Sequence, residues 1–548
     1  MEREELHRRI ELLQNKLKDG EIKFAPHLID GFWESMKQVK ILPDGMVDPE
    51  TVDGRVRSLC MFIAYENDRQ EWKDAVPLRD IQEGYFQRVN YAFGQLFEMM
   101  TEAKADPYKF AGWFSSDEGR VKDCLPVIDE FYNEIMQFWE NISEPTWMHL
   151  EDSFDSKAVF TGELFPDGRS NVASSTGLYF DTTILPDPFL KISPMLQFMS
   201  DEEKCYDVVR LALQVLSYKS LALADIEKPI VAVLPDRHQL EEGYREFVTD
   251  CAVSDSIEHT KTLFGQEIQD KDELFAYYSH FKDADEVVRG LIKPDKLVFA
   301  TEWDGSLAQQ MMRLLEEQGE KLGMKTAGQA VFMHLISRFS QANDAFQRSL
   351  QLRGTPIIRA ETSWIWYNQM LEYNAGNSEL DKLNDLHIAR ALNSTVKNEI
   401  PWMGNIPPDA LIEIRKSGAL DEIRNLLSAG LKSVIEANPS NFYRTGDKVF
   451  DNLDSAFKEH ETKIKELISK KWTFAGKDIG SFVVVGGVEI TAAITGLPMF
   501  GALGAIAGMT GVIPTVRDLK EKYKQLKAEE SEINSTGVGI LLKNKRQK

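Results

Sequence analysis

The sequence predicts a mainly α, multidomain protein with a small β or α/β element in its middle and a hydrophobic helical hairpin near its C-terminus. Apolar residues recur at helical spacing through most of the chain, whereas β-like runs are confined to residues 155–301. Residues 479–516 contain a single ionisable side chain, Glu489. A chain of 548 residues exceeds what one hydrophobic core organises, so more than one domain is expected.

Two helices are predicted in detail before the hairpin. Pro408 followed by Asp409 suits a first helical turn, because proline has no N–H to leave unpaired there and an acid complements the helix dipole. This predicts a short helix over residues 408–416. An apolar stripe from Ile423 to Ile435 predicts a further helix that begins near Ala419, just after the breaker Gly418.

The β element is predicted from four short runs rich in β-branched and aromatic residues. They are Ala158–Phe165, Gly177–Leu185, Pro229–Leu234 and Lys296–Ala300. Two of them end in Pro-Asp, at Pro186-Asp187 and Pro235-Asp236, a dipeptide that turns the chain. We therefore divide the chain into five parts: a helical domain 1–151, a mixed domain 152–303, a helical domain 304–470, the hairpin with its flanking helix 471–531, and a polar basic tail 532–548.

Charge and cysteine content restrict the classes of function. The formal net charge of −23 repels phosphate backbones, so nucleic acid is not an expected partner. The four cysteines show no C-x-x-C spacing, which favours a reducing compartment without disulfides. The first fifteen residues interleave charges with apolar residues too closely for a signal-peptide core. We expect a cytoplasmic protein that associates with membranes only on activation.

The chain has no motif that announces an enzyme. The phosphate-binding, dinucleotide, serine-hydrolase and zinc-protease signatures are absent, and the nine histidines show no metal-ligand spacing. We expect no cofactor and no metal, and favour a non-enzymatic protein. One loose acidic cluster could bind a divalent cation, but in so acidic a chain it is better explained as a solvated surface: Glu151, Asp152, Asp155 and Glu163.

The strongest catalytic alternative is a metal-dependent nuclease or other hydrolase. Asp187 is followed by Glu202 and Lys204, the residue types that hold a metal and position a water in PD-(D/E)xK nucleases. That chemistry requires the second acid and the lysine on a strand. Ser200 and Glu203, however, form the pattern of a capping box, which predicts a helix there instead.

The most informative segment is residues 479–516, which divides into two apolar arms at Pro498. Each arm nearly spans a hydrocarbon core of about 30 Å. In the first arm, apolar residues contribute roughly −4 kcal/mol to membrane insertion and Glu489 opposes with roughly +3 kcal/mol. Insertion is therefore finely balanced. In the second arm, small residues line one face and allow close helix pairing: Gly501, Gly504, Gly508 and Gly511.

Three interpretations of this hairpin stay open. It is a buried centre of a folded domain, an oligomerisation surface, or a conditionally exposed membrane hairpin that resembles those of pore-forming bacterial toxins. If the hairpin is an oligomerisation surface, the protein can form a homo-oligomer. A soluble helical scaffold with a buried hairpin is the corresponding functional alternative to a membrane-active protein.

Two passages resemble segments of large uncharacterised bacterial proteins of the antiphage-defence type. The first is Gly177–Asp181 with Ile184–Pro188; the second is Ile400–Trp402 with Ile406–Leu411, Ile414 and Arg415. The resemblance implies a bacterial immunity or stress protein and brings no catalytic residues with it. We expect such a protein to bind a protein partner and to act on membranes through residues 479–516.

Overall fold

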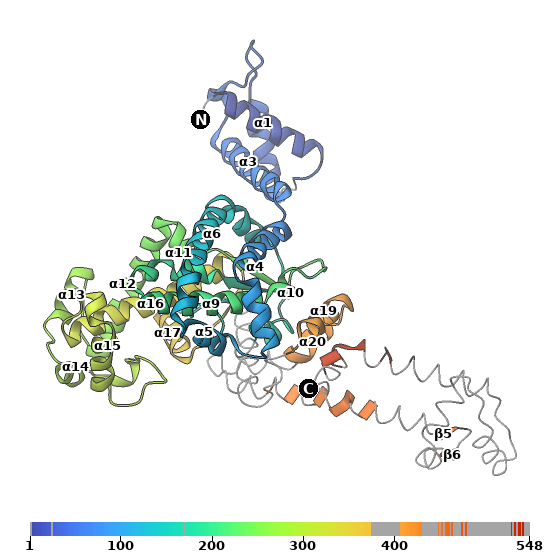
Figure 1. Cartoon of the computed structure of the whole chain (residues 1–548). Helices are drawn as coiled ribbons and strands as arrows, with labels where there is room; N and C mark the ends of the chain where they lie inside the picture. The colour runs from blue at the N-terminus through green and yellow to red at the C-terminus, as the bar shows by residue number, and fades with distance from the viewer. Residues whose placement is uncertain are drawn as a thin grey trace, which may run out of the picture. The chain divides into compact units, whose positions relative to one another are not determined.

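The computed structural model describes residues 3–22, 26–167, 171–373 and 406–429, together with short stretches between residues 448 and 541 (Figure 1). The chain divides into two compact units. Unit 1 comprises Met1–Tyr85 and Gln137–Ser153, and unit 2 comprises Phe86–Met136 and Phe154–Lys548. Helices predominate in both.

Unit 1 is built from helices whose apolar faces meet in a small core. Its elements are α1 (Arg3–Lys18), α2 (Pro26–Gln38), η1 (Pro49–Thr51), α3 (Gly54–Ala75) and parts of α4 (Leu78–Glu102) and α6 (Glu118–Asp152). Ile10 and Leu13, which share one apolar face of α1, are buried together with Val56, Cys60 and Ile63 of α3. The helical spacing of the sequence thus produces the packing it predicts.

Unit 2 contains a four-stranded, wholly parallel sheet in the order β3-β2-β1-β4. The strands are β1 (Lys157–Phe160), β2 (Thr182–Pro186), β3 (Val231–Leu234) and β4 (Thr355–Ile357). β1, β2 and β3 are buried along their whole length, as expected when helices cover both faces of a parallel sheet. From β1 the chain adds β2 and then β3 on one side, and it then crosses back to add β4 on the other side of β1. The strand order therefore reverses between β1 and β4, which makes this border a topological switch point.

Helices of widely different length connect and extend this sheet. They are α5 (Pro107–Ser115), α7 (Val172–Thr176), α8 (Pro188–Ile192), η2 (Ser193–Phe198), α9 (Asp201–Leu216), α10 (Lys219–Ala222), α11 (Arg237–Leu240), α12 (Glu242–Phe264), α13 (Lys271–Ser279), α14 (Ala284–Gly290), η3 (Pro294–Lys296), α15 (Leu307–Leu322), α16 (Ala327–Gln351), α17 (Glu361–Tyr373), α19 (Pro408–Lys416) and α20 (Leu420–Ser428). A short antiparallel pair, β5 (Thr473–Phe474) and β6 (Lys477–Asp478), follows. The largest apolar core outside the sheet lies among α12, α16 and α17 around Phe339 and Trp366.

Three of the four predicted β runs contain a strand, although β1 and β2 cover only part of their runs, and the prediction of a strand at Lys296–Ala300 is wrong. Residues 297–300 form an irregular segment after η3. Side chains satisfy its carbonyl groups, since Val298 O accepts hydrogen bonds from His334 Nε2 (2.8 Å) and Trp366 Nε1 (2.9 Å). The remaining strand of the sheet is β4, which the sequence did not predict. Its Pro356 is tolerated because β4 lies at the edge of the sheet.

The first of the two detailed helix predictions is confirmed, since α19 spans Pro408–Lys416. The second is confirmed at its start, because Ala419 is the N-cap residue of α20, but α20 ends at Ser428. Residues 430–435 of the predicted stripe lie outside the described residues. The predicted limit at 151/152 lies near the end of unit 1 at Ser153, but the predicted domain 1–151 also includes Phe86–Met136, which belong to unit 2. The limit at 303/304 falls inside unit 2, because β4 completes a sheet that begins at Lys157.

The predicted hairpin 479–516 lies outside the described residues, together with Glu489, Pro498 and the four glycines assigned to helix pairing. Within the part of the chain that the structure describes, no helix is both long enough and apolar enough to cross a membrane.

Candidate functional site

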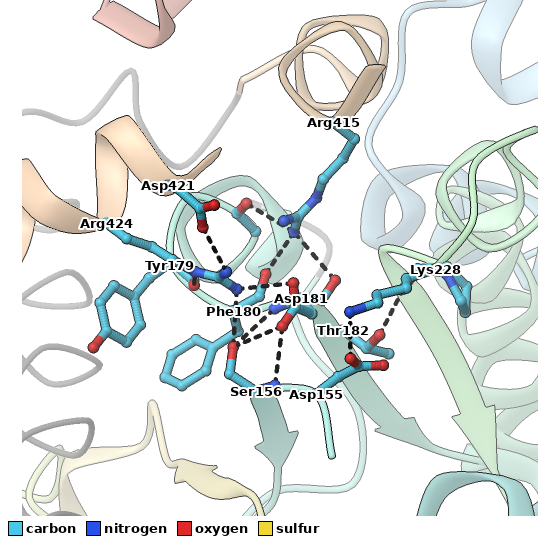
Figure 2. A network of polar contacts seen from close by, with 12 residues as sticks. Asp155, Ser156, Tyr179, Phe180, Asp181, Thr182, Lys228, Arg415, Asp421 and Arg424 are labelled. Atoms are coloured by element: carbon cyan, nitrogen blue, oxygen red, sulfur yellow. Dashed lines mark hydrogen bonds and ion pairs between the residues drawn. The ribbon is translucent and has the colours of Figure 1, made fainter. Parts of the chain in front are cut away.

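The amino ends of β1 and β2 carry a polar network that Figure 2 shows from close by. Asp181, just before β2, accepts a hydrogen bond from the backbone N–H of Ser156, just before β1, at 3.0 Å. Arg424 of α20 binds both: its Nη2 lies 2.9 Å from Asp181 Oδ1 and donates to Ser156 Oγ at 2.9 Å. Burial raises the pKa of Asp181, but Arg424 outweighs it and holds that pKa below its usual range. We call this side of the sheet the amino edge.

Arg415 of α19 completes the amino edge from the other side of the network (Figure 2). Its Nη2 donates to three backbone carbonyls, those of Gly177 (3.0 Å), Phe180 and Asp181 (3.1 Å). Burial lowers the pKa of Arg415 to about 10, against the opposing effect of Asp181. The two arginines therefore fasten α19 and α20 to the amino ends of β1 and β2, which lie more than 200 residues earlier in the chain.

α20 in turn receives chain from both sides of residues 479–516. Before that segment, Asn452 Nδ2 donates to the carbonyl of Ala429 at the end of α20 (2.9 Å). After it, the backbone N–H of Gly537 donates to Glu422 Oε2 (3.1 Å). Gly537 fits so closely against Ile423 that a Cβ there would lie 2.5 Å from Ile423 Cγ1. Both flanks of the apolar segment thus meet on one short helix.

The opposite side of the sheet, the carboxyl edge, gathers charged residues from every strand. Glu163 follows β1, Asp187 follows β2, Asp236 follows β3 and Arg359 follows β4. Asp187 and Asp236 are almost completely buried. Each accepts backbone N–H groups of the helix that begins after it, so each turns the chain as the Pro-Asp signal predicted.

Asp236 belongs to a buried ion network that reaches α16 and α12. Arg348 Nη2 donates to Asp236 Oδ1 at 2.9 Å and lies 3.2 Å from Asp344 Oδ2. Tyr244 donates its hydroxyl to Asp344 at 3.2 Å. Burial alone would lower the pKa of Arg348, but Asp344 and Asp236 outweigh it and keep the guanidinium charged.

Lys191 of α8 lies among the same charges without pairing directly with any of them. Its ammonium donates one hydrogen bond, to the backbone carbonyl of Glu163 at 3.1 Å. Burial lowers the pKa of Lys191, and Arg348 adds to this. Burial also raises the pKa of Glu163, whose Oε1 accepts the N–H of Ala360 at 2.9 Å.

The three residues of the nuclease alternative do not share a strand. Asp187 is the buried N-cap of α8, whereas Glu202 and Lys204 lie in the first turn of α9, where Glu202 is exposed. Ser200 and Glu203 form the predicted capping box. The nuclease chemistry requires the second acid and the lysine on a strand, whereas here both lie at the start of a helix.

Three of the four residues of the loose acidic cluster pair with cations, whereas the Glu163 carboxylate accepts a backbone N–H instead. In unit 1, Arg69 lies 3.1 Å from Glu151 and 2.8 Å from Asp152, and Lys73 lies 2.7 Å from Asp152. In unit 2, Lys228 pairs with Asp155. Among the described residues, no group of three or more histidine, cysteine or acidic side chains could hold a metal ion.

Comparison of the chain with protein-family models, with curated proteins and with solved structures finds no match. Two of the passages singled out in the sequence meet in the structure, because Arg415 Nη2 donates to the carbonyls of residues 177, 180 and 181.

Proposed function

We propose that this protein is a non-enzymatic bacterial immunity or stress protein that binds a protein partner and acts on membranes through residues 479–516. The observation that carries the proposal is the junction on α20. Both flanks of the apolar segment return to this helix, and Arg424 ties it to the sheet. A structural change at the amino edge would therefore be transmitted through α20 to the chain on both sides of the segment.

The energetics of the segment suit such a switch. The contributions to its insertion nearly cancel, so a few kcal/mol of partner binding is enough to move the population between a held and a released form. In the held form the protein is cytoplasmic; on release it associates with membranes. The partner supplies the difference in binding free energy between the two forms.

Liposome leakage by the full-length protein tests the proposal. Arg424→Met removes the ion pair with Asp181 and is expected to increase dye release from anionic vesicles severalfold over the wild type. Arg313→Met, which breaks the exposed pair with Glu317 on α15 and the cation–π contact with Trp303, is the matched control and should leave release at the wild-type level.

Two changes inside the apolar segment separate specific insertion from general unfolding. Val484→Asp and Gly504→Leu, each added to Arg424→Met, should return release to background, because a second buried charge opposes insertion and a leucine prevents close helix pairing. Equal leakage with and without these changes contradicts the proposal. Complete protease resistance of residues 479–516 without lipid binding would favour the scaffold alternative.

A further inference from the structure

Three buried polar atoms near the carboxyl edge have no hydrogen-bond partner. Thr161 is 1% exposed, and its hydroxyl has no hydrogen-bond partner. The Tyr132 hydroxyl, whose pKa burial raises with help from nearby Asp187, and Asp167 Oδ1 are likewise buried without a partner. Most buried polar groups in proteins are hydrogen-bonded, so each exception indicates hydrogen-bonding capacity that the fold leaves unused.

Lys191 adds an incompletely used cation to this edge. An ammonium offers three N–H donors, and Lys191 uses one, on the carbonyl of Glu163. No carboxylate of the described residues lies within ion-pairing distance of it, although Asp236 and Asp344 are near enough to affect its pKa. Lys191 as a whole residue is partly exposed, whereas its ammonium lies in buried surroundings.

The position of these groups in the fold is that of a ligand site. Ligands of open parallel sheets bind beyond the carboxyl ends of the strands, at the point where the strand order reverses. Here that point lies between β1 and β4, where Thr161 donates its backbone N–H to Ile357 O at 3.1 Å. Gly162 follows with φ +81°, and a Cβ there would lie 3.0 Å from Ile358. The chain thus turns sharply beside Thr161. Two residues later, the backbone carbonyl of Glu163 accepts the hydrogen bond from Lys191.

We propose that the carboxyl edge binds a small organic anion, whose oxygens accept hydrogen bonds from the Lys191 ammonium and the Thr161 hydroxyl. The unused groups decide the chemistry. The ammonium can only donate hydrogen bonds, and the two hydroxyls can donate as well, which suits the oxygens of an anion, while Asp167 Oδ1 can accept from a hydroxyl group of the ligand. This inference is independent of the membrane proposal, because the amino edge and α20 take no part in it.

Thermal unfolding of the full-length protein at constant ionic strength tests the proposal with three probes. Succinate supplies carboxylates, ribose 5-phosphate supplies a phosphate ester, and ribose is the neutral control. At least one of the two anions should raise the melting temperature in a concentration-dependent manner, and ribose should not. Succinate alone would identify a carboxylate ligand, and ribose 5-phosphate alone a phosphate ester.

Substitution of Lys191 locates the binding. Lys191→Met should weaken the binding of the effective anion by about tenfold or more, because a charge-assisted hydrogen bond is lost. Lys293→Met, at an exposed lysine after α14, is the matched control and should keep wild-type affinity. Undiminished binding to Lys191→Met would overturn the proposal, as would the absence of stabilisation by either anion.

Thr161→Val separates a binding role from a structural one, and it remains informative if Lys191→Met folds poorly. Valine has nearly the shape of threonine without the unpartnered hydroxyl, so the ligand-free variant should melt at or above the wild-type temperature. The same variant should bind the anion more weakly. A variant that is more stable and binds the anion as well as the wild type would show that the hydroxyl meets only water, and would contradict the proposed contact.

Discussion

The two edges of the parallel sheet use their charged side chains differently. At the amino edge, Arg415 and Arg424 come from helices more than 200 residues later and bind backbone carbonyls and Asp181. At the carboxyl edge, Lys191 donates a single hydrogen bond and Thr161 has an unpaired hydroxyl. The first arrangement joins distant parts of the chain. The second leaves hydrogen-bonding capacity for a molecule that is not part of the chain.

This difference matters because buried charge is costly to the folded state unless it is compensated. At the amino edge Arg424 pairs with Asp181, whereas Arg415 binds three carbonyls through Nη2 and leaves its Nε and Nη1 without a hydrogen-bond partner. At the carboxyl edge, Asp236 and Asp344 compensate the charge of Arg348. Lys191 donates only to a backbone carbonyl and pairs with no carboxylate of the described residues. Binding sites commonly retain such groups at some expense to stability.

The largest effect is expected at the one fully compensated ion network of the carboxyl edge. Arg348→Met leaves Asp236 and Asp344 buried without their cation, which should lower the free energy of unfolding by about 3–5 kcal/mol. Urea denaturation followed by circular dichroism measures this. The exposed Arg313→Met serves as control, with an expected change within about 0.5 kcal/mol. A loss as small for Arg348 as for Arg313 would show that the network is not essential.

A smaller loss is expected at the amino edge. Arg415→Met removes the donor to three carbonyls, two of them in the buried residues Gly177 and Phe180, and should cost about 1–3 kcal/mol. It should also accelerate proteolytic cleavage after residue 405, because α19 loses its attachment to the sheet. Cleavage at the wild-type rate would mean that apolar packing alone holds α19.

The smallest effects concern pH, and they have opposite signs at the two edges. The pKa of Glu163 is raised in the folded state, so its contribution to stability is present at low pH and lost as the pH rises through that value. The pKa of Asp181 is lowered, so its contribution is present above the unfolded-state pKa and lost as the pH falls through the folded one.

Paired amide variants measure this contrast. Glu163→Gln should be at least as stable as the wild type at pH 7, with the advantage disappearing toward pH 4. Asp181→Asn should be less stable by about 1 kcal/mol at pH 7, with the deficit disappearing as the pH falls below 4. Urea denaturation at pH 3.5, 5 and 7 is the measurement. Deviations of the same sign for both variants would remove the distinction between the edges.

The sequence predicted elements well where local signals suffice. Pro408 marked the start of α19, and the Ser200 capping box marked α9. β4 was missed because Gly354-Thr355-Pro356 has the composition of a turn, and only its position at the sheet edge permits a strand there. Lys296–Ala300 was mistaken for a strand because His334 and Trp366, which satisfy its carbonyls, are distant in sequence.

The carboxyl edge was only partly accessible from the sequence. The Pro-Asp dipeptides that end in Asp187 and Asp236 were recognised as turn signals. That they also place two buried carboxylates at the same edge of a parallel sheet depends on the strand order, which the sequence does not show. Lys191 and Arg348 carry no motif, since their role arises from tertiary packing. For this reason the sequence paired Asp187 with Glu202 and Lys204 instead.

Hydrogen exchange of the full-length protein, with and without the stabilising anion, tests the contrast between the two edges most directly. The account predicts that slowed exchange is confined to backbone amides of the carboxyl edge, in peptides covering residues 161–163 and 187–191, while residues 177–181 and 415–424 exchange at unchanged rates. Protection concentrated at the amino edge, or spread equally over both, would contradict it.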